Sequence, residues 1–260
     1  MAHLTVNCFS NVLGHCISFE ALLPETATNQ IGMNSVDGGD TYPVLYLLHG
    51  LSDDQTIWMR RTSIERYVSA LGIAVIMPFG ERSFYSDMQC GRRYWTFLSE
   101  ELPVLCRNFF PRISPRREDT FAAGLSMGGY GALKLALRRP DRFAAAASLS
   151  GVLDIAAFVK RQLPDNAAFW NAIYASPEAL ENSEDNLFVA AKKAVQAEHP
   201  PKLFACCGTS DFLYADNQNA VKILRETGVD LTYEEGPGSH TWEFWDQWIR
   251  RALEWMPIRK

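Results

Sequence analysis

The sequence is that of an acidic globular chain of ordinary composition. Its 260 residues are enough for one large domain, and 47% apolar with 21% charged residues is typical of a soluble protein. The net charge of −5 argues against a nucleic-acid-binding surface, so we expect no nucleic-acid partner. No apolar run of about 18 residues occurs, so we expect neither a membrane span nor a membrane partner.

The first residues and the cysteines bear on the cellular compartment. The opening stretch MAHLTVNCFS has no basic region followed by an apolar core, so no signal peptide is expected. The six cysteines form neither a CxxC pair nor a zinc-ligand spacing. We therefore predict reduced thiols, a cytoplasmic protein and no metal site.

Two β-like runs open the chain and predict an antiparallel hairpin. They read HLTVNCFS and HCISFEAL, and a turn near residues 11–14 joins them. A polar loop follows at 24–42, and after it apolar runs alternate with helical stretches. The predicted strands are 43–50, 73–78, 120–126, 143–151, 201–208 and 230–236. The predicted helices are 56–72, 95–110 with a kink at Pro103, 127–139, 215–228 and 241–256.

This alternation predicts an α/β fold with a doubly wound, mostly parallel sheet. The unbroken apolar character of VLYLL and AVIM is typical of strands that are covered on both faces. Residues 152–200 lie outside the alternation, and we interpret them as a lid inserted over the carboxyl edge of the sheet, where ligands bind in such folds. The expected organisation is a single domain, 1–260, with an N-terminal hairpin and a lid at about 152–200.

The stretch AAGLSMGGYGALKLAL contains a GxSxG motif centred on Ser126. The motif joins an apolar strand to a helix, which is the context that a nucleophile elbow requires. Glycines on both sides of the serine permit a sharp turn, and the following helix directs its N-terminal N–H groups at the site. Ser126 is therefore the predicted nucleophile.

A base and an acid should follow the serine in the chain. Of the five histidines, His240 lies in a Gly-rich loop between the last strand and the last helix, where the base is expected. The acid should follow the penultimate strand, and CGTSDFLY offers Asp211 there. Asp154, after the preceding strand, and Asp216, which we expect in the first turn of a helix, rank below Asp211. The predicted order is Ser126, Asp211, His240.

An oxyanion hole needs two further backbone donors. One is expected to be the N–H of Met127, directly after the serine. The other should come from the loop after the first central strand, which reads His49-Gly50-Leu51. We favour the N–H of Leu51 over that of Gly50, and we expect His49 to pack there without acting as a base.

Three tryptophans are candidates for substrate binding. Trp58, Trp95 and Trp170 could line an acyl or alcohol pocket, because such pockets are mostly apolar and aromatic. Aromatic residues at such positions are more often part of the core. Both interpretations stay open at the level of sequence.

Together these stretches closely resemble the tributyrin esterase branch of the esterase D-like α/β-hydrolases. That family also includes S-formylglutathione hydrolases, feruloyl esterases and mycolyltransferases. The stretches that carry the resemblance are VLYLLHGLSDDQTIWMRRTSIER, YWTFLSEELP, FAAGLSMGGYGALKLAL, CGTSDFLY and GSHTWEFWDQWI. After Gly50 the chain reads LSDD, whereas the formylglutathione hydrolases carry a threonine–cysteine pair in that loop.

The resemblance implies an α/β-hydrolase fold and a serine carboxylesterase that needs no metal. It supports the same triad and the same two oxyanion donors, and it implies short acyl chains. The predicted function is hydrolysis of acetyl to butyryl esters of small molecules through an acyl-enzyme, without a cofactor. Three alternatives stay open: an S-formylglutathione hydrolase-type thioesterase, an acyltransferase, and a binding protein that kept the fold. The aromatic face of the last helix is compatible with a homo-oligomer.

Overall fold

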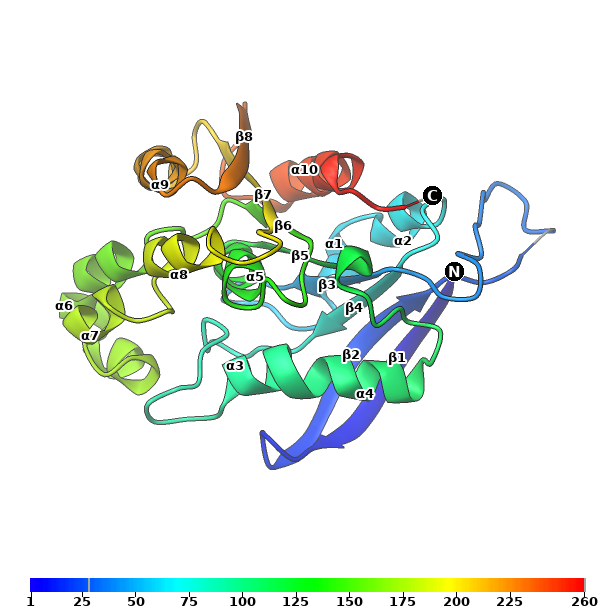
Figure 1. Ribbon diagram of the computed structural model, residues 1–260, viewed down its shortest axis with the longest axis horizontal. Coiled ribbons are helices and arrows are strands. Elements are labelled where there is room, and N and C mark those ends of the chain that lie inside the picture. Colours follow the sequence, from blue (N-terminus) through cyan, green and yellow to red (C-terminus); the bar gives the residue numbers. More distant parts are fainter. Residues whose placement is uncertain (28, 260) are drawn as a thin grey trace.

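One eight-stranded sheet organises the computed structural model, which describes residues 1–27 and 29–259 (Figure 1). The strand order is β1-β2-β4-β3-β5-β6-β7-β8. The strands are β1 (Ala2–Ser10), β2 (His15–Leu23), β3 (Val44–Leu48), β4 (Ala74–Pro78), β5 (Thr120–Leu125), β6 (Ala145–Leu149), β7 (Lys202–Gly208) and β8 (Asp230–Gly236).

The pairing confirms a mostly parallel sheet with an antiparallel N-terminal hairpin. β1 pairs with β2, and β2 with β4, in antiparallel fashion, whereas every neighbouring pair from β4 to β8 is parallel. Leu48 of β3 pairs with Gly124 of β5, and Leu125 pairs with Leu149 of β6. The carboxyl ends of the three central strands therefore lie together at one edge, where ligands bind in open α/β sheets.

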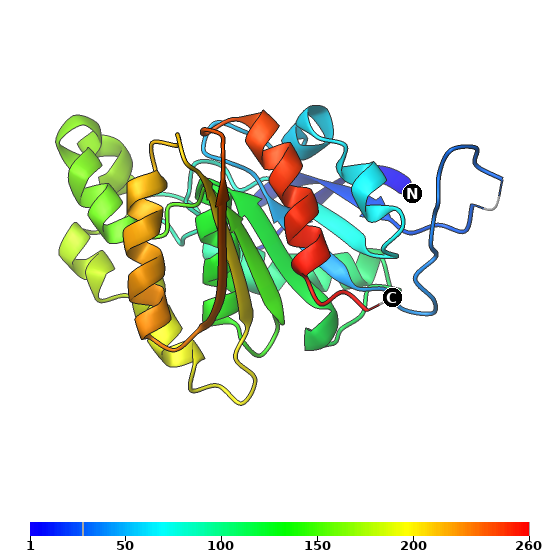
Figure 2. The same cartoon turned by 90° about the horizontal axis from the view of Figure 1, so that it is seen from above.

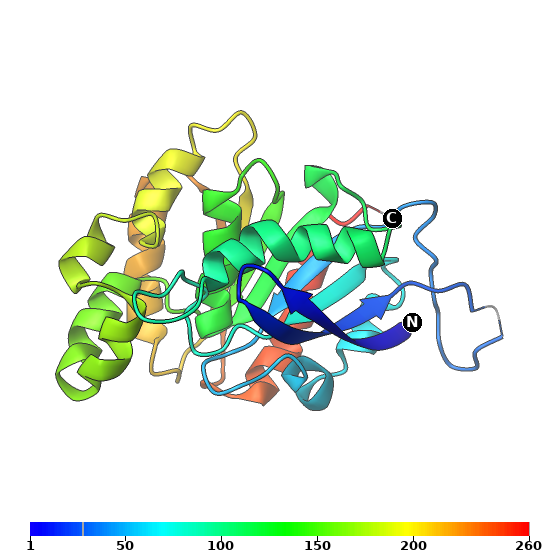
Figure 3. The same cartoon turned by 90° about the horizontal axis from the view of Figure 1, so that it is seen from below.

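Helices cover both faces of the sheet. Alternate residues of β3 face opposite ways, because Val44 and Tyr46 pack in one core cluster and Leu45 and Leu47 in the other. The first cluster includes buried residues of α4, α5, α8 and α9, and the second those of α1, α2 and α10. Figure 2 shows α10 lying over one face, and Figure 3 shows α4 on the other side with the hairpin.

The helices have the following bounds. They are α1 (Ile57–Arg61), α2 (Ile64–Val68), α3 (Tyr94–Thr96), α4 (Leu102–Phe109), α5 (Met127–Arg138), α6 (Ile155–Ile173), α7 (Pro177–Glu181), α8 (Leu187–Ala194), α9 (Tyr214–Glu226) and α10 (Trp242–Trp255). A π-helical turn, η1 (Phe97–Glu101), joins α3 to α4, and a short 3₁₀ turn, η2 (Arg117–Asp119), precedes β5. Within the described residues, no helix is long and apolar enough to cross a bilayer.

Two predicted helices differ from the structure. The helix expected at 56–72 is divided into α1 and α2, because Thr62 is extended and the N–H of Ser63 donates to Asp246 of α10 at 3.2 Å. The kink expected at Pro103 is replaced by the π turn η1, in which the N–H of Leu102 reaches the carbonyl of Phe97. This wider turn directly precedes the proline, whose ring would clash with an ordinary helical turn.

The segment between β6 and β7 contains α6, α7 and α8, and we call residues 152–200 the inserted segment. Its helices α6 and α7 lie at one end of the molecule (Figure 1). Inside α6, Asn166 has non-helical backbone angles two residues after Pro164, so two helical pieces meet there. α8 packs against α5, the helix that begins at the predicted nucleophile.

Candidate active site

Ser126 lies on a strained turn between β5 and α5. Its backbone has φ 52° and ψ −118°, a region that residues with a side chain rarely adopt. The N–H of Ser126 donates to the carbonyl of Leu149 at 2.9 Å, which fixes the turn to β6. A Cβ on Gly128 would lie 2.4 Å from the carbonyl oxygen of Leu48, so only glycine lets the helix start so close to β3.

The three side chains predicted as a triad form one hydrogen-bonded chain. His240 Nε2 lies 3.0 Å from Ser126 Oγ, and His240 Nδ1 lies 2.9 Å from Asp211 Oδ2 and 3.1 Å from Oδ1. With the proton on Nδ1, the imidazole donates to the carboxylate and accepts from the serine hydroxyl. The arrangement can take up the serine proton and stabilise the imidazolium that results.

Asp211 is buried, yet its surroundings favour the charged form. Burial by itself would raise the pKa of this carboxyl, but hydrogen bonds from His240 and from the N–H of Leu213, at 2.8 Å, lower the pKa below its ordinary value. The carboxylate is therefore ionised at neutral pH. The imidazole also packs against Phe212 and Trp245, with ring centroids 4.6 and 4.8 Å away.

The lower-ranked acids have other partners. Asp154 caps α6 and accepts from the N–H of Ala157 at 3.0 Å. Asp216 lies in the first turn of α9 and pairs with Arg161 of the inserted segment. Among these acids, Asp211 is the one that the structure brings to His240.

His49 has a contact that the sequence did not indicate. Its Nδ1–H donates to the carbonyl of Gly50 at 2.7 Å, and its Nε2 accepts from the N–H of Gly80 at 2.9 Å. Burial lowers the pKa of His49 to about 4, so the ring is neutral at pH 7. The Gly50 carbonyl belongs to the same planar peptide group as the Leu51 N–H. His49 therefore fixes the direction of the predicted oxyanion donor.

The three tryptophans lie in different places. Trp58 of α1 is fully buried, and its Nε1–H donates to the carbonyl of Leu48 at 3.0 Å. Trp95 packs beneath the guanidinium of Arg138, 3.9 Å from its ring centroid. Trp170 of α6 is 3% exposed and packs against Phe84, with ring centroids 5.0 Å apart. Contact of these side chains with a substrate stays a prediction.

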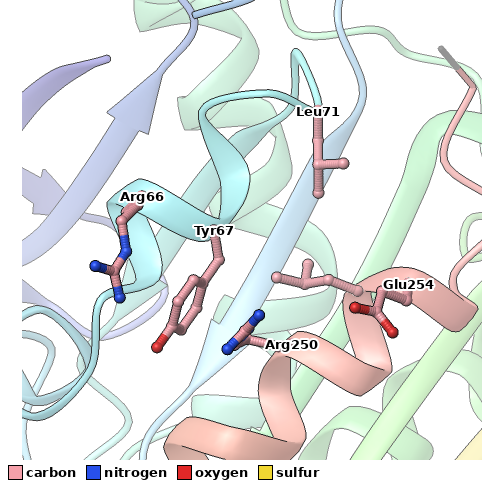
Figure 4. A pocket seen from close by; sticks show the side chains of 6 residues that line it. Arg66, Tyr67, Leu71, Arg250 and Glu254 are labelled. Atoms are coloured by element: carbon pink, nitrogen blue, oxygen red, sulfur yellow. The ribbon is translucent and has the colours of Figure 1, made fainter. Parts of the chain in front are cut away.

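Two cavities bear on where a ligand would bind. One of about 340 Å³ lies beside the loop after β3, the predicted oxyanion loop, and is lined by Leu13, His15, Cys16, Ile17, Ser18, Asp54, Gln55, Phe79 and Tyr94. Another of about 480 Å³ lies between α2 and α10 and is lined by Arg66, Tyr67, Leu71, Arg250, Leu253 and Glu254 (Figure 4). Neither lining includes Ser126, Asp211 or His240, but Asp54 and Gln55 of the first cavity belong to the loop after β3, in which Leu51 also lies. In the described part of the chain, no group of three or more potential ligands is placed to hold a metal ion.

Comparison with known proteins places the chain among esterases. A family model described as "Putative esterase" matches residues 10–256. An acetyl esterase of Caldicellulosiruptor saccharolyticus is 32% identical over 263 residues, which cover 98% of each chain. The structure of FphF, a fluorophosphonate-binding serine hydrolase of Staphylococcus aureus, is 36% identical with a TM-score of 0.87 and covers 100% of this chain and 99% of its own.

A second solved structure is that of an S-formylglutathione hydrolase, FrmB, also from Staphylococcus aureus. It is 36% identical with a TM-score of 0.83 and covers 98% of each chain. These similarities extend over the sheet, both helical layers and the inserted segment. The chain therefore belongs to the esterase family of α/β-hydrolases, and it is a carboxylic ester hydrolase.

Proposed function

We propose that this protein hydrolyses short-chain acyl esters, acetyl to butyryl, through an acyl-enzyme on Ser126. The observation that carries the proposal is the continuous chain of hydrogen bonds from Asp211 through His240 to Ser126. The similarity to an acetyl esterase over 98% of both chains supports the small acyl group.

In the first half of the reaction, Ser126 Oγ bonds to the ester carbonyl carbon while its proton passes to His240 Nε2. Asp211 accepts the hydrogen bond from Nδ1–H and stabilises the imidazolium. The negative charge that develops on the carbonyl oxygen is met by the N–H groups of Leu51 and Met127. Each such donor lowers the barrier by about 3 kcal/mol. The imidazolium then gives its proton to the departing alcohol as the carbon–oxygen bond breaks.

In the second half, water takes the place of the alcohol. His240 removes a proton from the water as its oxygen attacks the acyl-enzyme carbonyl. Collapse of the second tetrahedral intermediate returns the proton to Ser126 Oγ and releases the carboxylic acid. The proposed residues perform these steps by proton transfer and hydrogen bonding, so no cofactor is part of the mechanism.

The cavity beside the oxyanion loop supports a small substrate. Phe79 of the cavity wall stacks on His49 with ring centroids 5.7 Å apart, and His49 donates to the carbonyl of Gly50. Its volume of about 340 Å³ is near the lower end of small-molecule sites. We propose that one arm of the ester lies there and that the inserted segment acts as a lid over the site.

A series of p-nitrophenyl esters from acetate to octanoate tests this function. We expect kcat/KM to be highest between acetate and butyrate and to fall for longer chains, which exceed the space available. Ser126→Ala should keep the fold by circular dichroism and lose turnover, by about 10⁶-fold as for other serine-hydrolase nucleophiles. Activity of this variant near that of the unmodified enzyme would refute the proposal.

A thioester substrate is the second candidate, because the S-formylglutathione hydrolase FrmB is 36% identical. The comparison that separates the two is the rate on S-formylglutathione against the rate on a butyrate ester, measured with the same preparation. A kcat/KM at least tenfold higher on the thioester would favour this candidate. The oxyester should be preferred if the proposal above is correct.

A further inference from the structure

We propose that Tyr85 is a positioning residue for the oxyanion hole, and that Lys134 and Asp185 act on the reaction through it. The inference rests on the proposed function and extends it to three buried or partly buried residues whose hydrogen bonds go to partners other than Ser126 and His240. Tyr85 belongs to the loop after β4, Lys134 to α5 and Asp185 to the inserted segment.

The backbone at Gly50 decides where the Leu51 N–H points. A Cβ at this position would lie 2.7 Å from Leu125 Cδ1 and 2.8 Å from Asp53 Oδ2, so a larger residue would have to displace these side chains. Glycine is also the residue with the greatest backbone freedom. Two hydrogen bonds remove that freedom. The Tyr85 hydroxyl donates to the carbonyl of His49 at 2.9 Å, and His49 Nδ1–H donates to the carbonyl of Gly50 at 2.7 Å. The peptide groups on both sides of Gly50 are thereby fixed.

Tyr85 itself has an unusual backbone that its neighbours stabilise. Its φ is 50°, in the left-handed region that a side chain disfavours. Its N–H donates to Ser83 Oγ at 3.0 Å. Its ring is buried against α5 so closely that a Cβ on Gly131 would lie 2.5 Å from Tyr85 Cδ2. Its carbonyl accepts a hydrogen bond from Lys134 Nζ at 3.1 Å.

Lys134 is fully buried, and the proposed mechanism does not use it. Its ammonium group has three protons and three oxygen partners: the Tyr85 carbonyl, Ser86 Oγ at 2.8 Å and Asp185 Oδ1 at 2.9 Å. A buried cation requires a paired anion, and Asp185 supplies it. Arg138 donates to the same carboxylate at 2.6 Å.

These contacts connect both proposed oxyanion donors to the same helix, α5. The Met127 N–H belongs to the first residue of α5. The Leu51 N–H is connected to the middle of α5 through Tyr85 and Lys134. Tyr130 of α5 donates to the backbone carbonyl of Asp185 at 2.6 Å, so the inserted segment is fixed to the same helix. The distance between the two donors must suit one oxygen atom, and a shared rigid element keeps it constant.

The test is Tyr85→Phe, which removes one hydroxyl and keeps the ring in place. We expect kcat on p-nitrophenyl acetate to fall about tenfold while KM changes less than twofold, because the lost hydrogen bond positions a donor that is used only when the oxyanion forms. Titration with a fluorophosphonate probe corrects kcat for the amount of active enzyme. The matched control is Tyr67→Phe, which loses a hydrogen bond of 2.9 Å to Asp246 beside the remote cavity of Figure 4.

A second readout separates positioning from general loosening of the structure. A trifluoromethyl ketone forms an oxyanion on Ser126, whereas the matching methyl amide only occupies the site. Tyr85→Phe should weaken the ketone about tenfold, in step with kcat, and leave the amide's inhibition constant unchanged. Unchanged kcat in Tyr85→Phe, or an equal loss in Tyr67→Phe, would overturn the inference. Equal weakening of both inhibitors would do the same.

The part assigned to Asp185 is tested by a double-mutant cycle. Asp185→Asn alone should lower kcat severalfold. The double variant, Tyr85→Phe with Asp185→Asn, should have a kcat within twofold of that of Tyr85→Phe alone. If the loss of kcat in the double variant equalled the product of the two single losses, Asp185 would not act through Tyr85. Ser126→Ala keeps this inference distinct from the proposed function: an inactive Ser126→Ala enzyme with an unaffected Tyr85→Phe enzyme refutes only the positioning role.

Discussion

Asp211 shows how one buried residue combines two opposing requirements. Its side chain is completely shielded from solvent, which favours the neutral acid, while His240 and the Leu213 N–H favour the carboxylate. The hydrogen bonds prevail, and the pKa lies below its ordinary value. The negative charge can therefore orient His240 without taking its proton.

Replacing Asp211 by asparagine isolates this charge. The amide is the same size, but its N–H₂ would favour the imidazole tautomer that cannot accept the Ser126 proton. We expect kcat to fall by about 10³–10⁴, as in other triads, with KM within a few-fold. Asp154→Asn is the matched control, since that carboxylate only caps α6. If Asp154→Asn lost activity on this scale and Asp211→Asn did not, the acid would be misassigned.

At the scale of elements, the start of α5 packs very closely against the end of β3. The helix comes so close to the end of β3 that a Cβ on Gly128 would lie 2.4 Å from the Leu48 carbonyl oxygen and 2.6 Å from that of His49. Both atoms are backbone, so neither can move aside alone. The start of α5, the turn at Ser126 and the end of β3 are thus one packed unit.

Gly128→Ala should therefore affect stability and activity together. We expect the free energy of unfolding to fall by about 3 kcal/mol, because the methyl group must push α5 or β3 away. Activity per folded molecule should fall as the two proposed oxyanion donors, the N–H groups of Leu51 and Met127, move apart. Urea denaturation and kcat measure the two effects. Gly228→Ala is the comparison, with φ 88° and open space around it, and should cost about 1 kcal/mol with kcat unchanged. If Gly128→Ala lowered the free energy of unfolding no more than the comparison variant and left kcat unchanged, this account of the packing would be wrong.

At the scale of the whole molecule, the sheet determines which distant residues meet. Ser126 follows β5, Asp211 follows β7 and His240 follows β8, and the parallel order β5-β6-β7-β8 brings all three ends to one edge. The same edge contains the loops after β3 and β4 and therefore His49 and Tyr85. The hydrogen bonds of His49 and Tyr85 at this edge contribute both to the stability of the protein and to the geometry of the site.

His49 makes that stability depend on pH. The folded protein keeps the ring neutral down to a pKa of about 4, while the unfolded chain protonates near 6.5. The unfolded state thus binds more protons between these values, so stability is lost as the pH falls from 6.5 to 4. The full loss from this residue is about 3 kcal/mol. Urea denaturation at pH 7 and pH 4.5 should show it, and His49→Asn should have a smaller pH dependence. An NMR titration in which His49 protonates above pH 6 would contradict the prediction.

Sequence alone determined the features that depend on local pattern. Unbroken apolar runs mark the central strands, a GxSxG motif marks the nucleophile turn, and chain order indicates where the base and acid stand. β8 begins and ends at the predicted residues, and α5 and α10 lie within one residue of the predicted bounds. These signals need only neighbouring residues, because backbone periodicity and turn chemistry are local.

The tertiary structure decided what depends on contacts between distant segments. Residues 56–72 form two helices because Asp246, 183 positions later, accepts the N–H of Ser63. His49 acts on the Gly50 carbonyl, and Tyr85 on the His49 carbonyl, through backbone atoms that no residue type reveals. Lys134 and Asp185 are 51 positions apart and pair only because the inserted segment packs on α5. A sequence pattern records which side chains are present, whereas folding buries some of their polar atoms, and those atoms must then form hydrogen bonds with one another.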